Sequence, residues 1–278
     1  MKRYVTTIEY NRGLSGRYLL LASIIALCAL GIATIGLYQP GSPLQLSRAD
    51  HFLIQGNVDR ALELYQQEVE AGWTTYQRRV AHERMASVLS LEKNKERAAA
   101  EEWESLAQLT TSDGSNPARY WTNAATHYVI DGTVPERAAR AFTMAAKSSA
   151  SEEESASLAL LAGQQWVRSG STDEAERVWV HISNQYPSHR SDALSSLGKL
   201  SLGLGHTEEA LTWFEDAVDA ARNEAQRLNG KMGVQMSLER LGNLDEAIAE
   251  LNETGLSEAL RDVRTQKMLE RGEKLQMQ

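Results

Sequence analysis

A short pattern that returns about every 37 residues constrains this chain more than any other feature of its sequence. The pattern is a glycine, an acidic residue three positions later and an alanine five positions later. Four copies keep this spacing, and two weaker copies lie between the first two of them. The weaker copies begin at Lys93, which replaces the glycine, and at Gly132, which is followed by one extra residue. The six alanines that mark the copies are Ala61, Ala98, Ala138, Ala175, Ala210 and Ala247.

Apolar residues on both sides of Ala210 predict that each copy joins two helices. After this alanine, apolar side chains such as Leu211, Phe214 and Val218 recur at spacings of three and four, which is typical of one helix face. A second helical stripe runs from Ala193 to Leu202 before it. Steps of 37, 40, 37, 35 and 37 residues between the marking alanines therefore indicate a solenoid of helix–turn–helix units. We expect the alanines to lie where two helices cross closely.

The residues at the repeated positions resemble those of the tetratricopeptide repeat family. The resemblance covers roughly residues 44–255 and departs from the family pattern at Glu102, where an aromatic residue is expected. It implies an all-α solenoid of about six repeats, whose first helices line a concave groove that takes a peptide or a partner helix. The residues that carry the resemblance are Tyr65, Trp121, Tyr128, Phe142, Gly163, Trp179, Pro187, Leu197, Gly198 and Phe214.

Residues 18–38 form an uncharged stretch of 21 residues with a tyrosine at each end. As a helix this stretch would be about 30 Å long, which is enough to cross the hydrocarbon core of a membrane. Four basic residues precede it and one, Arg48, follows closely, so the positive-inside rule places the N-terminus in the cytoplasm. The repeats would then lie on the far side of the inner membrane, in the periplasm of a bacterium. The alternative is a signal peptide cleaved near Ala29 and Gly31.

These features divide the chain into four parts. Residues 1–17 are predicted to be a cytoplasmic segment, 18–38 a single transmembrane helix, 39–43 a linker and 44–278 the repeat domain. The stretch after Ser257 predicts a capping helix at the end of that domain. The repeats fill nearly all of it, which leaves no room for a separate catalytic domain. The net charge of −8 argues against nucleic acid as a partner.

The sequence contains no motif for catalysis, metal binding or a cofactor. No two of the six histidines are three or four residues apart, so no helix presents a two-histidine metal site. We therefore expect neither enzyme activity nor a cofactor. An enzyme remains a third class of function, because a reactive site can lie in a repeat groove without a motif.

The function predicted from the sequence is protein binding by an anchored adaptor, with partners in envelope assembly or secretion. Its alternative is a periplasmic or secreted repeat protein, released by signal cleavage, that coordinates cell-envelope biogenesis. The repeat register predicts which side chains face the groove, although methionines at helical spacing are also typical of a core. The candidate groove residues are Gln164, Arg168, Lys199, Met232, Met236 and Arg240.

Overall fold

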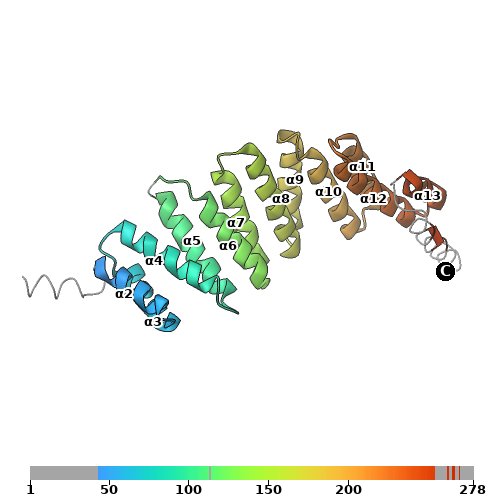
Figure 1. Cartoon of the computed structure of the whole chain (residues 1–278). Coiled ribbons are helices and arrows are strands. Elements are labelled where there is room, and N and C mark those ends of the chain that lie inside the picture. The colour runs from blue at the N-terminus through green and yellow to red at the C-terminus, as the bar shows by residue number, and fades with distance from the viewer. Residues whose placement is uncertain (1–42, 113, 254–261, 263–264, 267–268, 270–278) are drawn as a thin grey trace, which may run out of the picture. The chain divides into compact units, whose positions relative to one another are not determined.

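The computed structural model describes residues 43–112 and 114–253, together with residues 262, 265, 266 and 269. These residues form twelve α-helices and no strand, which confirms the predicted all-α repeat architecture (Figure 1). In chain order they make six helix pairs. The helices are α2 (Pro43–Ile54), α3 (Val58–Ala71), α4 (Thr75–Leu89), α5 (Glu96–Ser112), α6 (Ala118–Asp131), α7 (Pro135–Ser148), α8 (Glu152–Arg168), α9 (Thr172–Gln185), α10 (Arg190–Leu204), α11 (Thr207–Asp219), α12 (Glu224–Leu241) and α13 (Leu244–Glu253).

The predicted cytoplasmic segment, the transmembrane helix 18–38, residues 39–42 of the linker and most of the predicted capping helix lie outside the described residues. Within the described part of the chain, no helix combines the length and the apolar composition needed to cross a membrane. The first described helix begins at Pro43, where proline is favoured because its missing N–H would have no partner in the first turn.

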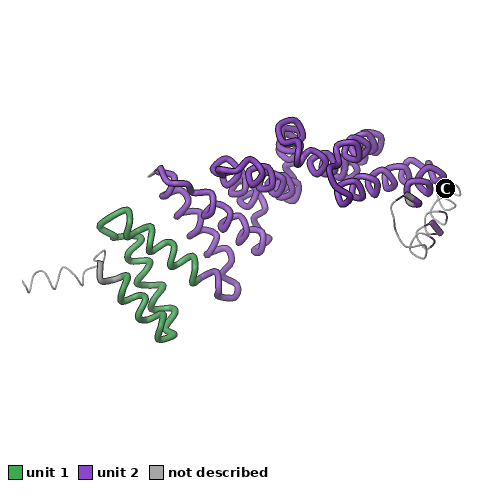
Figure 2. The backbone as a smooth tube through the Cα atoms, turned by 45° about the horizontal axis from the view of Figure 1, so that its top comes forward, with its two compact units in different colours: residues 1–88 green, residues 89–278 purple. Residues whose placement is uncertain are grey.

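The chain divides into two compact units, residues 1–88 and residues 89–278 (Figure 2). In the first unit, apolar side chains of α2, α3 and α4 pack around the buried Leu64 and Tyr65. In the second unit, α5 to α13 follow one another so that each helix contacts the next one along the chain. The first helices of successive repeats also touch, since α10 contacts both α8 and α12.

The connection within each helix pair contains one residue with a positive φ angle. Glycine takes this position in five of the turns, and Asn94, with a φ of 61°, takes it in the second. Asparagine is the residue other than glycine that most readily adopts this left-handed conformation. In the second repeat, Asn94 therefore occupies the glycine position. The sequence pattern predicts Lys93 at this position instead.

This shift moves the marking alanine of the second repeat from Ala98 to Ala99. The N–H of Ala99 donates to the carbonyl of Lys95 at 2.8 Å, as the N–H of Ala210 does to His206 at 3.0 Å. Ala99 is fully buried, whereas Ala98 is only partly buried. The aromatic residue four positions later is then the buried Trp103. With Ala99 as the marking alanine, Trp103 takes the aromatic position. The second repeat therefore does not depart from the family pattern at Glu102.

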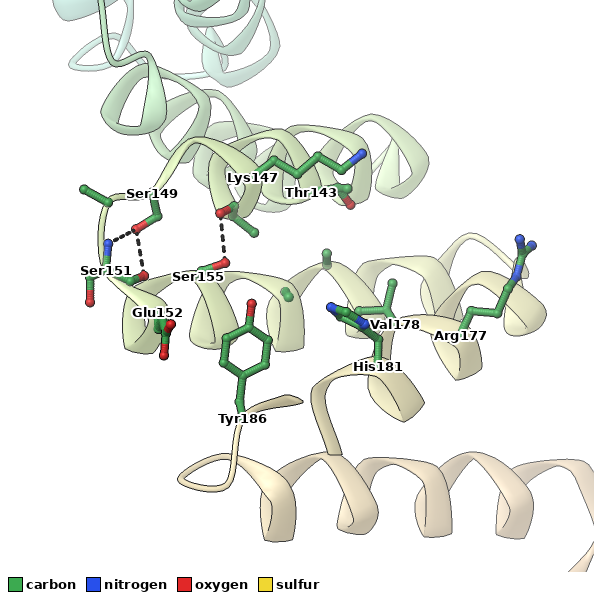
Figure 3. A pocket seen from close by; sticks show the side chains of 14 residues that line it. Thr143, Lys147, Ser149, Ser151, Glu152, Ser155, Arg177, Val178, His181 and Tyr186 are labelled. Atoms are coloured by element: carbon green, nitrogen blue, oxygen red, sulfur yellow. Dashed lines mark hydrogen bonds between the residues drawn. The ribbon is translucent and has the colours of Figure 1, made fainter. Parts of the chain in front are cut away.

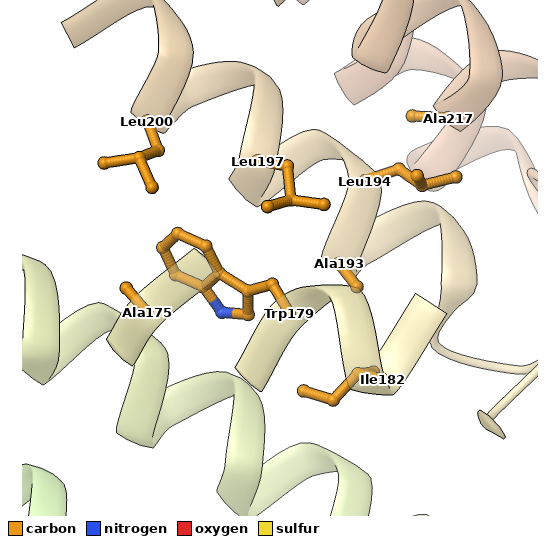
Figure 4. Close-up of a cluster of buried hydrophobic side chains, with 8 residues drawn as sticks. All are labelled: Ala175, Trp179, Ile182, Ala193, Leu194, Leu197, Leu200 and Ala217. Carbon is orange, nitrogen blue, oxygen red and sulfur yellow. The ribbon is translucent and has the colours of Figure 1, made fainter. Parts of the chain in front are cut away.

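The core of the fourth and fifth repeats shows why the family pattern pairs a glycine with an aromatic residue. A Cβ atom on Gly163 of α8 would lie 2.3 Å from the indole Nε1 of Trp179 on α9, so no side chain fits there. Trp179 packs with Ile182 of the same helix and with the α10 leucines Leu194, Leu197 and Leu200 (Figure 4). Helices α8 and α9 can therefore pack closely only because Gly163 has no Cβ atom.

Ionic side chains join three successive helices on the surface of the second unit. Arg137 of α7 donates to Glu101 at 2.6 Å and to Glu104 at 2.9 Å, both on α5. The hydroxyl of Tyr128 on α6 donates to the same Glu104 at 2.5 Å, and burial raises the pKa of this phenol. The first unit repeats the arrangement with Tyr65, Asp50 and Arg84. These contacts join neighbouring helices within each unit.

Candidate protein-binding surfaces

The six predicted groove residues lie on the first helices of the fourth, fifth and sixth repeats. Gln164 and Arg168 are exposed on α8, and Lys199 is exposed on α10. On α12, Met236 is 41% exposed, Met232 is half-buried and Arg240 is exposed. Because α10 contacts α8 and α12, these side chains stand on three neighbouring helices.

Two of these six side chains form hydrogen bonds within the chain. Lys199 Nζ donates to Asn229 Oδ1 on α12 at 3.2 Å. Arg240 Nη1 donates to the carbonyl of Leu202 at 2.6 Å, where it satisfies an oxygen in the last turn of α10. Arg240 therefore stabilises the end of α10, while Gln164, Arg168 and Met236 are also exposed.

The predicted crossing alanines occupy buried positions in five of the six repeats. Ala61, Ala138, Ala175, Ala210 and Ala247 have no accessible surface. The exception is Ala98, which is only partly buried because Ala99 takes the marking position in the second repeat. The alanines lie one turn into the second helix of each pair, where a larger side chain would collide with the first helix.

A cavity of about 530 Å³ opens between α7, α8 and α9 (Figure 3). Small apolar side chains contribute much of its lining, among them Ala146, Ala159 and Ala162. Tyr186, just after α9, closes one end and packs edge-on against His181 with ring centres 6.2 Å apart. The sequence analysis missed this cavity. Its small side chains come from two helices, with Ala146 on α7 and Ala159 and Ala162 on α8, so no single stretch of the sequence signals it.

The rim of the cavity carries charges of both signs. Lys147 of α7 and Arg177 of α9 contribute cations, and Glu152 at the start of α8 contributes a carboxylate. Arg177 is already paired with Glu174 at 2.6 Å, on the exposed surface. At the α7–α8 turn, Ser155 Oγ donates to the carbonyl of Ala146 at 2.9 Å and fixes the start of α8. The cavity can hold an apolar side chain of a partner, with a polar group at the rim.

One serine and one histidine of the second unit lie within hydrogen-bond distance. Ser90 Oγ and His127 Nε2 are 2.8 Å apart, and the indole N–H of Trp103 donates to the same serine at 3.1 Å. His127 Nδ1 is buried without a hydrogen-bond partner, so no carboxylate orients the ring as in a catalytic triad. Burial lowers the pKa of His127. The described residues also contain no group of three or more side chains that could hold a metal ion.

The sequence comparisons identify the repeats directly. The family model of the tetratrico peptide repeat matches residues 43–116 and 193–265, which together make up more than half of the chain. The chain therefore belongs to the tetratricopeptide repeat family. Its members are in general non-catalytic scaffolds that bind proteins. Residues 117–192, between the two matches, form the same succession of paired helices. No curated protein sequence matches the chain.

Several solved structures are similar to the chain at low identity. The apo form of the quorum sensor NprR from B. thuringiensis is 13% identical, with a TM-score of 0.47 over 81% of this chain and 68% of that one. MamA is 18% identical, with a TM-score of 0.39 over 62% and 93% of the two chains. BtubC from P. vanneervenii is 14% identical, with a TM-score of 0.44 over 76% and 85%. Likeness at this level carries no inference about function.

Proposed function

We propose that this chain is a non-catalytic scaffold held in a membrane by residues 18–38, with its repeats on the non-cytoplasmic side. There it binds protein partners of envelope assembly or secretion. Membership of the tetratricopeptide repeat family supports the binding role. The uncharged stretch of residues 18–38 and the basic residues before it support the anchor and its orientation.

The proposed binding site rests on one observation, the side chains that α8, α10 and α12 present to solvent. These are the first helices of the fourth, fifth and sixth repeats. Arg168 of α8, Lys199 of α10 and Met236 of α12 are all exposed, and none belongs to the buried core. A cation on each of two helices and a flexible thioether on the third suit an amphipathic helix or peptide with acidic residues. Binding through this surface would leave the fold unchanged.

The test is to replace Arg168, Lys199 and Met236 together with serine and to compare partners crosslinked in native membranes. We expect partners to be lost while helical content and melting temperature stay within the range of the unmodified chain. The matched control is Ala150→Trp, which would fill the cavity between α7, α8 and α9 from an exposed turn position. Loss of partners in the control alone would place binding in that cavity instead.

The alternative function, a periplasmic repeat protein released by signal cleavage, differs in where the mature chain is found. A chain that stays in washed membranes at full length supports the anchor. A shorter chain in the soluble fraction supports cleavage near Ala29 and Gly31.

A further inference from the structure

The turn between α3 and α4, taken together with the first residues of α4, presents two aromatic side chains to solvent. Trp73 is 57% exposed and Tyr76 is 71% exposed. By contrast, Trp103, Trp121 and Trp179 are buried in the second unit. Exposed tryptophan is costly in water, because its large apolar surface stays hydrated.

This turn is held rigidly, so the exposure of its aromatic residues is fixed by the fold. The N–H of Gly72 donates to the carbonyl of Glu68 at 2.9 Å and ends α3. Thr74 and Gln77 share three hydrogen bonds, of 3.0, 3.0 and 3.1 Å, that cap the start of α4. Arg78 Nη1 then reaches back to the carbonyl of Gly72 at 3.0 Å. None of these contacts requires an aromatic side chain at residue 73 or 76.

The turn lies at the end of the first unit where the described chain begins. Helices α2 and α3 pack as an antiparallel pair joined by residues 55–57, so the end of α3 returns to the start of α2 (Figures 1 and 2). The predicted transmembrane helix ends at residue 38, and α2 starts at Pro43. The five residues of the linker span at most about 17 Å. This end of the first unit is therefore tethered close to the bilayer if the anchor is retained.

We propose that Trp73 and Tyr76 insert into the interfacial layer of the membrane that holds residues 18–38 and dock the first repeat against it. The proposal rests on the proposed anchor. Tryptophan and tyrosine are the residues enriched at this layer, since their rings are apolar and their N–H or O–H groups stay hydrated. Arg78 and Arg79 follow in α4, are partly exposed and can attract anionic headgroups. The partner of this surface is thus lipid and not another protein.

The test uses the full chain reconstituted into phosphatidylcholine vesicles, with and without bromine atoms on the upper part of the acyl chains. Bromine quenches tryptophan only where the ring enters the bilayer. Residues 18–38 contain no tryptophan, so the anchor itself adds no signal. If the six tryptophans emit equally, bromine should lower the emission by at most about one sixth, and Trp73→Phe should abolish the loss.

The matched control is Ile54→Ser, at the opposite end of the α2–α3 pair. Ile54 is 84% exposed, so its replacement should leave the quenching at the level of the unmodified chain. Tyr76→Ser keeps Trp73 as the reporter and should reduce the quenching, with far-UV circular dichroism to show that each variant is folded.

Flotation of the vesicles separates the two ways in which the proposal can fail. A chain that does not float with the vesicles contradicts the anchor, and the docking of the turn falls with it. A chain that floats, but is quenched equally with and without Trp73, contradicts the docking alone. Floating together with quenching that disappears in Trp73→Phe supports both.

Discussion

Single atoms decide how closely the helices of a repeat approach. In the fourth repeat the missing Cβ of Gly163 gives the indole of Trp179 its place, and in the fifth Gly198 does the same for Phe214. Elsewhere on the same helices a glycine has no such role, since a Cβ on Gly203 would meet nothing within 4 Å. Two chemically identical substitutions should therefore change stability in opposite directions.

We expect Gly163→Ala to lower the free energy of unfolding by about 1–3 kcal/mol, because the added methyl group overpacks the contact with Trp179. Gly203→Ala, on the exposed side of α10, should instead raise it by about 0.5–1 kcal/mol, because alanine loses less backbone entropy on folding. Denaturant unfolding of both variants is the measurement. Equal effects of the two changes would contradict the packing seen at Gly163.

The second residue-scale prediction concerns His127. Burial lowers the pKa of its imidazole, so the folded chain holds the neutral ring while the unfolded chain takes up a proton near the ordinary value of 6.5. Its contribution to stability is therefore present above pH 6.5 and is lost as the pH falls from that value through the lower pKa of the folded state. Melting temperatures measured across this range should fall more steeply for the unmodified chain than for His127→Gln. Parallel curves would show that His127 does not titrate on unfolding.

At the scale of the element, each turn sets the register of the helix that follows it. A residue with positive φ lies in the turn, and the alanine four residues after the N-cap of the second helix is then buried. The second repeat obeys this geometry through Asn94 and Ala99, although its sequence suggests Lys93 and Ala98. The register thus follows from backbone conformation, which two residue types can supply, and not from the identity of one glycine.

Leucine substitutions test this register directly. Ala99→Leu should overpack the fully buried site of Ala99 on α5 and cost about 1–3 kcal/mol, as Ala210→Leu should on α11. Ala98→Leu should cost less, because Ala98 is only partly buried. The midpoints of thermal unfolding give the comparison. A larger loss for Ala98→Leu would restore the register predicted from the sequence.

At the scale of the whole molecule, the place of the repeats in the cell determines which partners they can meet. In the proposed anchored chain, the distribution of charge around residues 18–38 is the sequence feature that would set its orientation. Four basic residues, Lys2, Arg3, Arg12 and Arg17, precede the stretch. The same stretch would tether the first repeat, with its exposed aromatic turn, next to the bilayer.

A reporter fused after Gln278 that works only outside the cytoplasm should be active, because the basic residues retain the N-terminus inside. Replacing the four basic residues with neutral ones should lower that activity. A strictly cytoplasmic reporter serves as the opposite control at the same position. Activity of the cytoplasmic reporter in the unmodified chain would contradict the orientation.

The sequence by itself determined the repeat period, the six helix pairs and the buried place of five marking alanines. These features are local, because helical spacing and turn residues lie within about one repeat. They can therefore be recognised directly from the sequence. It also placed Gln164, Arg168, Lys199, Met232, Met236 and Arg240 on first helices, and their part in binding stays a prediction.

Only the tertiary structure decided the register of the second repeat and the cavity between α7, α8 and α9. Asn94 adopts a left-handed conformation, and a sequence pattern based on glycine does not predict it. The cavity needs side chains from three helices, together with Tyr186 just after α9, and no single segment shows that they leave space. Packing between segments distant in sequence determines which volume stays unfilled, so neither feature could be derived from one stretch of residues.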